Sequence, residues 1–112
     1  MLLYNLDPEE FQKLRPRLRE LYTLAYRPLR QYAYRRVDEV DSYLSWLYSG
    51  DPAGFFVAGN ARGASRVVGF AAAHGSWRQG DGSLIAELHE LVVDPGWHGR
   101  GIGTALIRRV VE

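Results

Sequence analysis

The sequence predicts a mixed α/β fold (an α+β mixed sheet) with elements in the order β-α-α-β-β-β-α. Three observations support this prediction. The first half of the chain has two stretches with apolar residues at helical spacing, and the middle has two short apolar stretches joined by a polar turn. The last third has an apolar stretch, a glycine-rich turn and a further helical pattern. The length of 112 residues suits one domain.

The first strand and the first helix are predicted from the N-terminal residues. Residues 2–6 form a short apolar run that is typical of a strand. A helix is expected to begin after Asp7, because its carboxylate can cap free amides and Glu10 completes a capping box. Pro16 lies inside the apolar stripe that follows, so we expect a kink or a break there. Pro28 is expected to mark the end of this helix.

The middle of the chain predicts a second helix and a hairpin. The helix is expected from Asp38 to the stop signal at residues 50–52, which read Gly-Asp-Pro. Residues 54–59 and 66–74 predict two strands, and the short polar link between them predicts an antiparallel hairpin. Residues 75–83 contain three glycines and are expected to form a loop.

A strand over residues 84–93, a glycine-rich turn and a helix over residues 102–112 complete the pattern. The first amides of a helix have no partner within it, and the helix dipole adds partial positive charge there. Glycines let phosphates approach the backbone closely, and Thr104 can add a hydroxyl. The turn therefore predicts an anion site suited to a pyrophosphate, in which Gly99, Gly101 and Gly103 allow the close approach.

Two common nucleotide motifs do not match this turn. A Walker A loop needs Gly-Lys-Ser/Thr, and a dinucleotide fingerprint needs Gly-x-Gly-x-x-Gly rather than the Gly-x-Gly-x-Gly found here. The segment instead resembles the acetyl-CoA motif of the GNAT N-acetyltransferase superfamily. Residues 91–95 (Leu-Val-Val-Asp-Pro) match its strand end, Leu-x-Val-x-Pro, and residues 98–103 match its loop, Gln/Arg-x-x-Gly-x-Gly/Ala. His98 stands where the family has Gln or Arg.

The resemblance implies a GNAT-like fold and transfer of an acetyl group from acetyl-CoA to a primary amine. It implies that the amides of residues 99–104 cradle the pyrophosphate, with Arg100 contributing its N–H rather than its guanidinium. It also implies that the backbone of Leu91 and Val93 pairs with the pantetheine arm as an added strand, and that one of their amides polarises the thioester carbonyl. The expected acetyl-CoA-binding residues are Leu91, Val93, His98, Gly99, Arg100, Gly101, Gly103 and Thr104.

Two glutamates are candidates for the base that deprotonates the acceptor amine. In some members of the family a glutamate in the place of Glu87 has this role, although a solvated strand carboxylate is an equal alternative. Glu90 is the second candidate, and period-two alternation would place it on the opposite face from Glu87 and His89. For His89 a structural hydrogen bond is the favoured role. Five aromatic residues can line an acceptor pocket, although on helices they more often form core: Tyr22, Tyr26, Tyr32, Tyr34 and Trp46. Trp77, in the predicted glycine-rich loop, is a better candidate for a ring that faces the substrate.

Charge and composition exclude other classes of function. Residues 11–36 contain eight basic residues and one acidic residue, while the net charge of the chain is +1. Such a stretch can bind phosphates, but we favour a solvated helix face and a basic loop, and no nucleic-acid partner is expected. The absence of cysteine excludes disulfides, Cys-ligated zinc and a thiol nucleophile, and no metal site is expected. No apolar run approaches the roughly 20 residues of a membrane helix, and no signal peptide is recognised, so we expect a cytoplasmic protein.

In the GNAT fold, further strands and a helix follow the loop helix. The resemblance therefore implies that residues 1–112 are a single domain, truncated after the helix of the acetyl-CoA loop, with residues 84–93 as an edge strand. A fragment of a longer acetyltransferase is the favoured explanation, and a homodimer that pairs through this edge is the second. The alternative function is a non-catalytic acyl-CoA-binding or protein-interaction module that keeps the fold.

Overall fold

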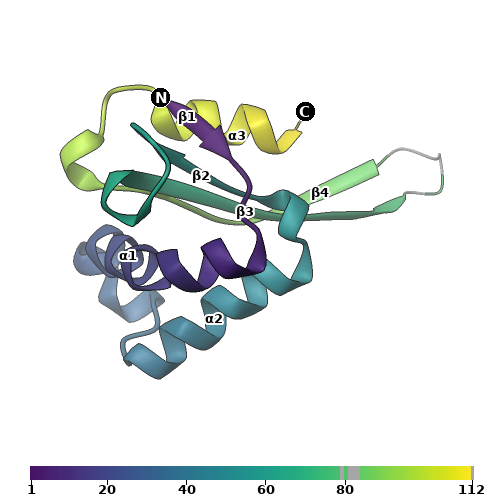
Figure 1. Cartoon of the computed structure of the whole chain (residues 1–112). Helices are drawn as coiled ribbons and strands as arrows, with labels where there is room; N and C mark the ends of the chain where they lie inside the picture. Colours follow the sequence, from purple (N-terminus) through teal and green to yellow (C-terminus); the bar gives the residue numbers. More distant parts are fainter. Residues whose placement is uncertain (79, 81–83, 112) are drawn as a thin grey trace.

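The computed structural model describes residues 1–78, 80 and 84–111, without the side chains of residues 76–78 and 84–86. The order of strands and α-helices is the predicted one (Figure 1). A 3₁₀ segment, η1 (Arg27–Tyr32), lies between the first two α-helices. The elements are β1 (Leu2–Tyr4), α1 (Pro8–Tyr26), α2 (Val37–Gly50), β2 (Phe55–Gly59), β3 (Val67–Arg78), β4 (Leu84–Val93) and α3 (Ile102–Val111).

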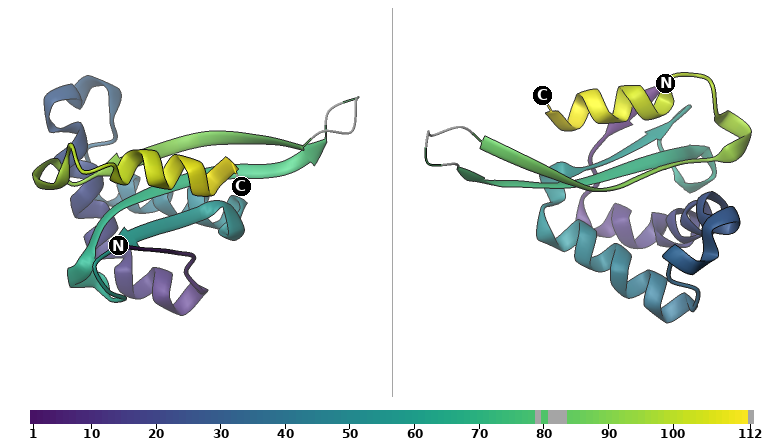
Figure 2. Two further views of the ribbon diagram at one scale, coloured as in Figure 1. Left: turned by 90° about the horizontal axis from the view of Figure 1, so that it is seen from above. Right: turned by 180° about the vertical axis from the view of Figure 1, so that it is seen from behind.

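The strands form one sheet in the order β1-β2-β3-β4, and all neighbouring strands are antiparallel. The predicted hairpin of β2 and β3 is confirmed. Helices α1 and α2 cover one face of the sheet and α3 covers the other (Figures 1 and 2). β4 is the last strand in this order, so it lies at an edge of the sheet formed by the described residues.

Strand β3 is longer than the sequence predicts. It continues to Arg78, and its last residues pair with the start of β4, so the predicted loop is wrong for residues 75–78. Long-range pairing with β4 outweighs the local preference of Gly75 and its neighbours for a loop. Residues 79 and 81–83 of that predicted loop lie outside the described residues.

Helix α1 begins as predicted and then continues through its proline. The Asp7 carboxylate accepts from the Glu10 N–H at 2.7 Å, and the Glu10 carboxylate accepts from the Asp7 N–H at 3.1 Å. The alternative of a break at Pro16 is wrong, because α1 is continuous to Tyr26. Pro16 is exposed while Leu14 and Leu18 on either side are buried, so packing of the inner face offsets the missing hydrogen bond.

Alternate residues of the central strands supply two cores. Phe55 and Phe70 stack with ring centroids 5.6 Å apart, and they pack against the apolar faces of α1 and α2. Ala71, which follows Phe70 in β3, belongs to the second core with Leu106 of α3. Small side chains on this face let α3 pack closely on the sheet, and this packing positions the turn that precedes α3.

Candidate functional site

The turn between β4 and α3 is shaped by two glycines in the left-handed region. Gly99 has φ 79° and Gly101 has φ 77°, a conformation that side chains with a Cβ rarely adopt. The backbone bond from the Ala105 N–H to the Gly101 carbonyl, at 3.0 Å, opens the helix. The amides of residues 102–104 therefore precede the first helical bond and are available to an anion.

A hollow of about 400 Å³ lies at this turn. Seven of the eight residues expected to bind acetyl-CoA line it; the eighth, Arg100, does not, and its guanidinium lies 4.8 Å from the centroid of the Trp97 ring. Ile102, whose amide lies within the expected 99–104 cradle, also lines the hollow, and so does Trp97, which the sequence did not indicate. The full lining is Leu91, Val93, Trp97, His98, Gly99, Gly101, Ile102, Gly103 and Thr104.

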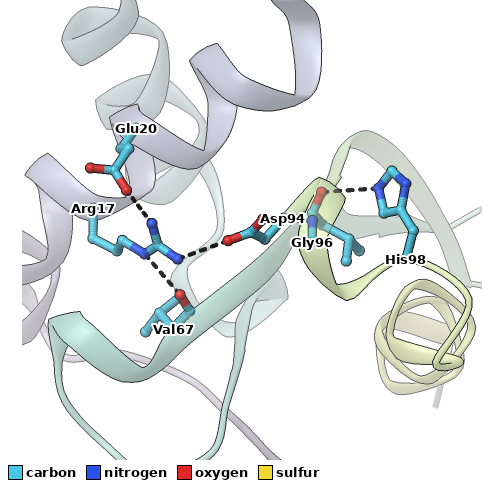
Figure 3. A network of polar contacts seen from close by, with 7 residues as sticks. Arg17, Glu20, Val67, Asp94, Gly96 and His98 are labelled. Atoms are coloured by element: carbon cyan, nitrogen blue, oxygen red, sulfur yellow. Dashed lines mark hydrogen bonds and ion pairs between the residues drawn. The ribbon is translucent and has the colours of Figure 1, made fainter.

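His98 closes the turn back onto the strand. Its Nε2 lies 3.2 Å from the carbonyl oxygen of Val93, at the end of β4 (Figure 3). A carbonyl can only accept, so this bond requires the proton on Nε2. The His98 side chain thus holds the turn from within, and a neutral ring is enough for that bond.

Arg17 of α1 holds the other side of the same turn. Its Nη2 lies 3.2 Å from Oδ2 of Asp94, its Nε donates to the Val67 carbonyl at 2.9 Å, and its Nη1 contacts Glu20 (Figure 3). The side chains of Arg17 and Asp94 are only 19% and 21% exposed. The other oxygen of Asp94 accepts from the Gly96 N–H at 2.9 Å. One guanidinium therefore ties α1, the start of β3 and the turn together, which the sequence did not indicate.

A β-bulge in β4 brings the two candidate bases to the same face of the sheet. Ala72 pairs with Glu90 and Ala73 pairs with Leu88, so His89 is the extra residue. Beyond the bulge Glu87 is opposite His74, whose ring contacts the carbonyl of Leu47 in α2. The prediction that Glu87 and Glu90 lie on opposite faces is therefore wrong, because the extra residue reverses the alternation.

Glu90 is buried, and tyrosines hold both of its carboxylate oxygens. The side chains of Tyr26 in α1 and Tyr43 in α2 each donate a hydrogen bond of 2.7 Å, and Glu90 is 6% exposed. Burial, followed by the hydrogen bond to Glu90 and its charge, raises the pKa of both tyrosines, so they remain donors. Glu90 thus joins both helices to β4, and it is buried with each of its oxygens already accepting a hydrogen bond.

Glu87 is in a different environment. Its side chain is 56% exposed, and its carboxylate lies 4.0 Å from Nε2 of His89. The His89 ring packs 4.3 Å from that of His74 and 5.0 Å from that of Trp46. Of the two candidate bases, Glu87 is the one that an acceptor can reach, and an aromatic and histidine cluster lies beside it.

Four of the aromatic candidates, Tyr22, Tyr26, Tyr34 and Trp46, belong to one aromatic cluster around Tyr43. Tyr22 is buried in the core, whereas Tyr32 and Trp46 are exposed. The ring of Tyr34 packs 5.1 Å from that of Tyr43. The side chain of Trp77 lies outside the described residues.

Comparison with known proteins identifies the family of this fold and turn. Residues 9–112 match the sequence profile of the acetyltransferase (GNAT) family. The chain belongs to the GNAT acetyltransferase family. An uncharacterised N-acetyltransferase of Methanocaldococcus jannaschii is 42% identical over 94 residues, and one of Archaeoglobus fulgidus is 37% identical over 93 residues. A crystal structure of a Pyrococcus horikoshii protein superimposes with a TM-score of 0.75 at 27% identity, and the match covers 98% of this chain.

This GNAT chain matches only part of each relative. The matches cover 83% and 82% of the chain but 40% and 61% of the two archaeal acetyltransferases, and 68% of the Pyrococcus protein. In the part of the chain that the structure describes, no helix combines the length and apolar character needed to cross a membrane.

Proposed function

We propose that this chain binds acetyl-CoA in the hollow before α3 and belongs to an N-acetyltransferase that acetylates a primary amine. The observation that carries the proposal is the single hollow that gathers seven of the eight expected residues around two left-handed glycines. Membership of the GNAT family supports the reaction class, and the N-acetyltransferase relatives support nitrogen as the acceptor atom.

The turn and the strand have separate tasks in this proposal. The amides of residues 102–104 bind the pyrophosphate, because they precede the first helical bond of α3. The backbone of Leu91 and Val93, at the edge of the sheet, pairs with the pantetheine arm. His98 and Arg17 hold the turn in place through Val93 and Asp94.

The reaction transfers the acetyl group directly. The amine nitrogen forms a bond to the thioester carbonyl carbon, the carbon–sulfur bond breaks, and CoA leaves as the thiolate, which takes up the second proton that the nitrogen loses on becoming an amide. The acceptor must first lose a proton from its ammonium form, and we assign this proton to the exposed carboxylate of Glu87. Glu90 is assigned a positioning role, since both of its oxygens already accept from tyrosines.

Calorimetry with acetyl-CoA, followed by an assay of CoA release with a panel of primary amines, tests the proposal on the whole chain. Saturable binding and amine-dependent release are expected. Absence of acetyl-CoA binding would refute the assigned site. Binding without release from any amine would favour the non-catalytic acyl-CoA-binding module.

The assignment of the base is tested by Glu87→Gln. The variant keeps the shape of the side chain and removes its proton acceptor, so the ascending limb of the pH–rate profile should change while acetyl-CoA affinity is retained. An unaltered profile would exclude Glu87 as the base.

A further inference from the structure

The basic residues of the segment 11–36 have different partners in the folded chain. Four of them form ion pairs: Lys13 with Glu9, Arg17 with Glu20 and Asp94, Arg19 with Asp41, and Arg36 with Asp38. Arg15 donates to the carbonyl of Asp41 and lies over the ring of Phe11. Among the described residues, the remaining three have no acidic partner: Arg27, Arg30 and Arg35.

These three arginines line one hollow of about 270 Å³, which we call the arginine hollow. It lies between the end of α1, η1 and the segment 33–35 that precedes α2, and its other lining residues are Thr23, Tyr26, Ala33 and Tyr34. Its volume is below the roughly 300 Å³ at which pockets for drug-sized ligands begin, so it suits one small charged group rather than a nucleotide.

The walls of the arginine hollow are held by internal hydrogen bonds. The N–H of Tyr34 donates to the buried Tyr22 hydroxyl at 3.1 Å, and the N–H of Ala33 donates to the Arg30 carbonyl at 3.2 Å. Nε of Arg35 donates to the same carbonyl at 3.4 Å. The fold therefore places three arginines around one hollow with no acidic partner in the part of the chain that the structure describes, an arrangement that a bound anion would stabilise through charge-assisted hydrogen bonds.

The arginine hollow is connected to the reaction centre through tyrosines. Tyr26 lines it and donates its hydroxyl to Glu90 of β4, and the ring of Tyr34 packs against Tyr43, which donates to the other oxygen of Glu90. The blue segment between α1 and α2 lies on the face opposite α3, at the same end of the sheet as the turn (Figures 1 and 2). Glu87 is on this same face.

We propose that the arginine hollow binds a carboxylate or phosphate group of the acyl acceptor, so that the substrate is an amine that also carries an anionic group. The identification of the ligand as the acceptor rests on the proposed function. The binding of an anion by the arginines does not, because it follows from their charge and their common hollow.

Anion binding is tested first, without acetyl-CoA. Backbone amide shifts of the whole chain are followed by NMR during titration with inorganic phosphate, and separately with succinate, at constant ionic strength. Saturable shifts are expected at residues lining the arginine hollow, and Arg30→Gln should weaken binding by about tenfold or more, the loss expected for a hydrogen bond to a charged group. The tighter of the two probes distinguishes a phosphate from a carboxylate ligand.

Arg108→Gln is the matched control, since it removes one positive charge from an exposed position on α3. Its affinity for the anion should equal that of the unchanged chain. Arg27→Gln and Arg35→Gln repeat the Arg30→Gln test at two other exposed arginines of the hollow, and each should weaken anion binding. Lack of saturation, or an equal loss of anion affinity in Arg30→Gln and Arg108→Gln, would overturn the anion site.

The acceptor class is tested with paired amines that differ in one anionic group: phosphoethanolamine with ethanolamine, and β-alanine with its amide. The anionic member should have a kcat/KM about tenfold higher, and Arg30→Gln should remove this preference. Equal turnover within each pair would overturn the anionic acceptor and leave the acetyltransferase proposal intact. Failure to bind acetyl-CoA would refute the acceptor assignment together with the proposed function, and the anion titration alone would then decide on the site.

Discussion

Replacing Gly101 by aspartate or by asparagine separates the charge of the turn from its shape. The φ of Gly101 is 77°, and a Cβ built there has no atom within 4 Å, so a side chain fits in space but strains the backbone. The left-handed conformation costs an L-residue roughly 1–2 kcal/mol, and Asn and Asp tolerate it best among residues with a side chain. Both variants share this cost and have nearly the same shape. They differ in that aspartate has a charged carboxylate where asparagine has a neutral amide.

The size of the charge effect follows from the proposed position of the pyrophosphate beside the amides of residues 102–104. Two like charges about 4 Å apart repel by about 1 kcal/mol in bulk water and about 4 kcal/mol near a protein surface. The hollow is open to solvent at an exposed turn, so its effective dielectric lies between these limits. Gly101→Asp should therefore bind acetyl-CoA between roughly fivefold and several hundredfold more weakly than Gly101→Asn.

Isothermal titration with acetyl-CoA measures this difference, and thermal unfolding of both variants checks that they fold equally. The difference between the dissociation constants of Gly101→Asp and Gly101→Asn should become smaller at about 1 M salt, where the Debye length falls to about 3 Å. Equal dissociation constants for the two variants at low salt would refute a phosphate beside Gly101.

Three further predictions concern the contacts that support the site. Arg17→Gln should lower the free energy of unfolding by about 1–3 kcal/mol, because it removes charge-assisted bonds from a part-buried side chain, while the exposed Arg108→Gln should stay within about 0.5 kcal/mol. Urea unfolding measures both free energies, and an equal loss of stability in the two variants would contradict the role of Arg17 in holding α1 to the turn. Tyr43→Phe should cost about 1–3 kcal/mol, because one oxygen of the buried Glu90 loses its donor; an unchanged urea midpoint would contradict this role. Burial raises the pKa of Tyr26 and Tyr43 above the ordinary 10.0, so their stabilising contribution is complete below pH 10 and lost as pH rises through their folded pKa. Burial also raises the pKa of Tyr22 and Tyr48, so an absorbance titration should find at least two tyrosines that ionise only with unfolding, and simple ionisation of all tyrosines near pH 10 would contradict it.

The elements that were predicted well depend on residues close to one another along the chain. The capping box of Asp7 and Glu10 is a local exchange of hydrogen bonds, and the bounds of β4 follow from its apolar run and the proline after it. The break offered as an alternative at Pro16 did not form, because burial of Leu14 and Leu18 outweighs a local preference. Local chemistry predicts an element well where tertiary packing agrees with it.

In the candidate site, too, some features follow from local sequence and others from tertiary packing. The order of elements and the glycine turn were determined by the sequence itself, because periodicity and left-handed backbone conformations depend on residues close along the chain. The bulge at His89 depends on pairing with β3, so strict alternation could not place Glu87 and Glu90 on one face.

Only the tertiary structure decided which charges are neutralised. Arg17 meets Asp94 across 77 positions of sequence, and Arg19 meets Asp41 across 22. The same folding leaves the arginines of the arginine hollow without an acidic partner among the described residues. In the sequence the basic residues of the segment 11–36 cannot be told apart. Only the packing of α1, α2 and the sheet separates those that form ion pairs from those that line the arginine hollow. The physical reason is that Coulomb attraction and hydrogen bonding depend on distance in space, which the spacing of residues along the chain does not determine.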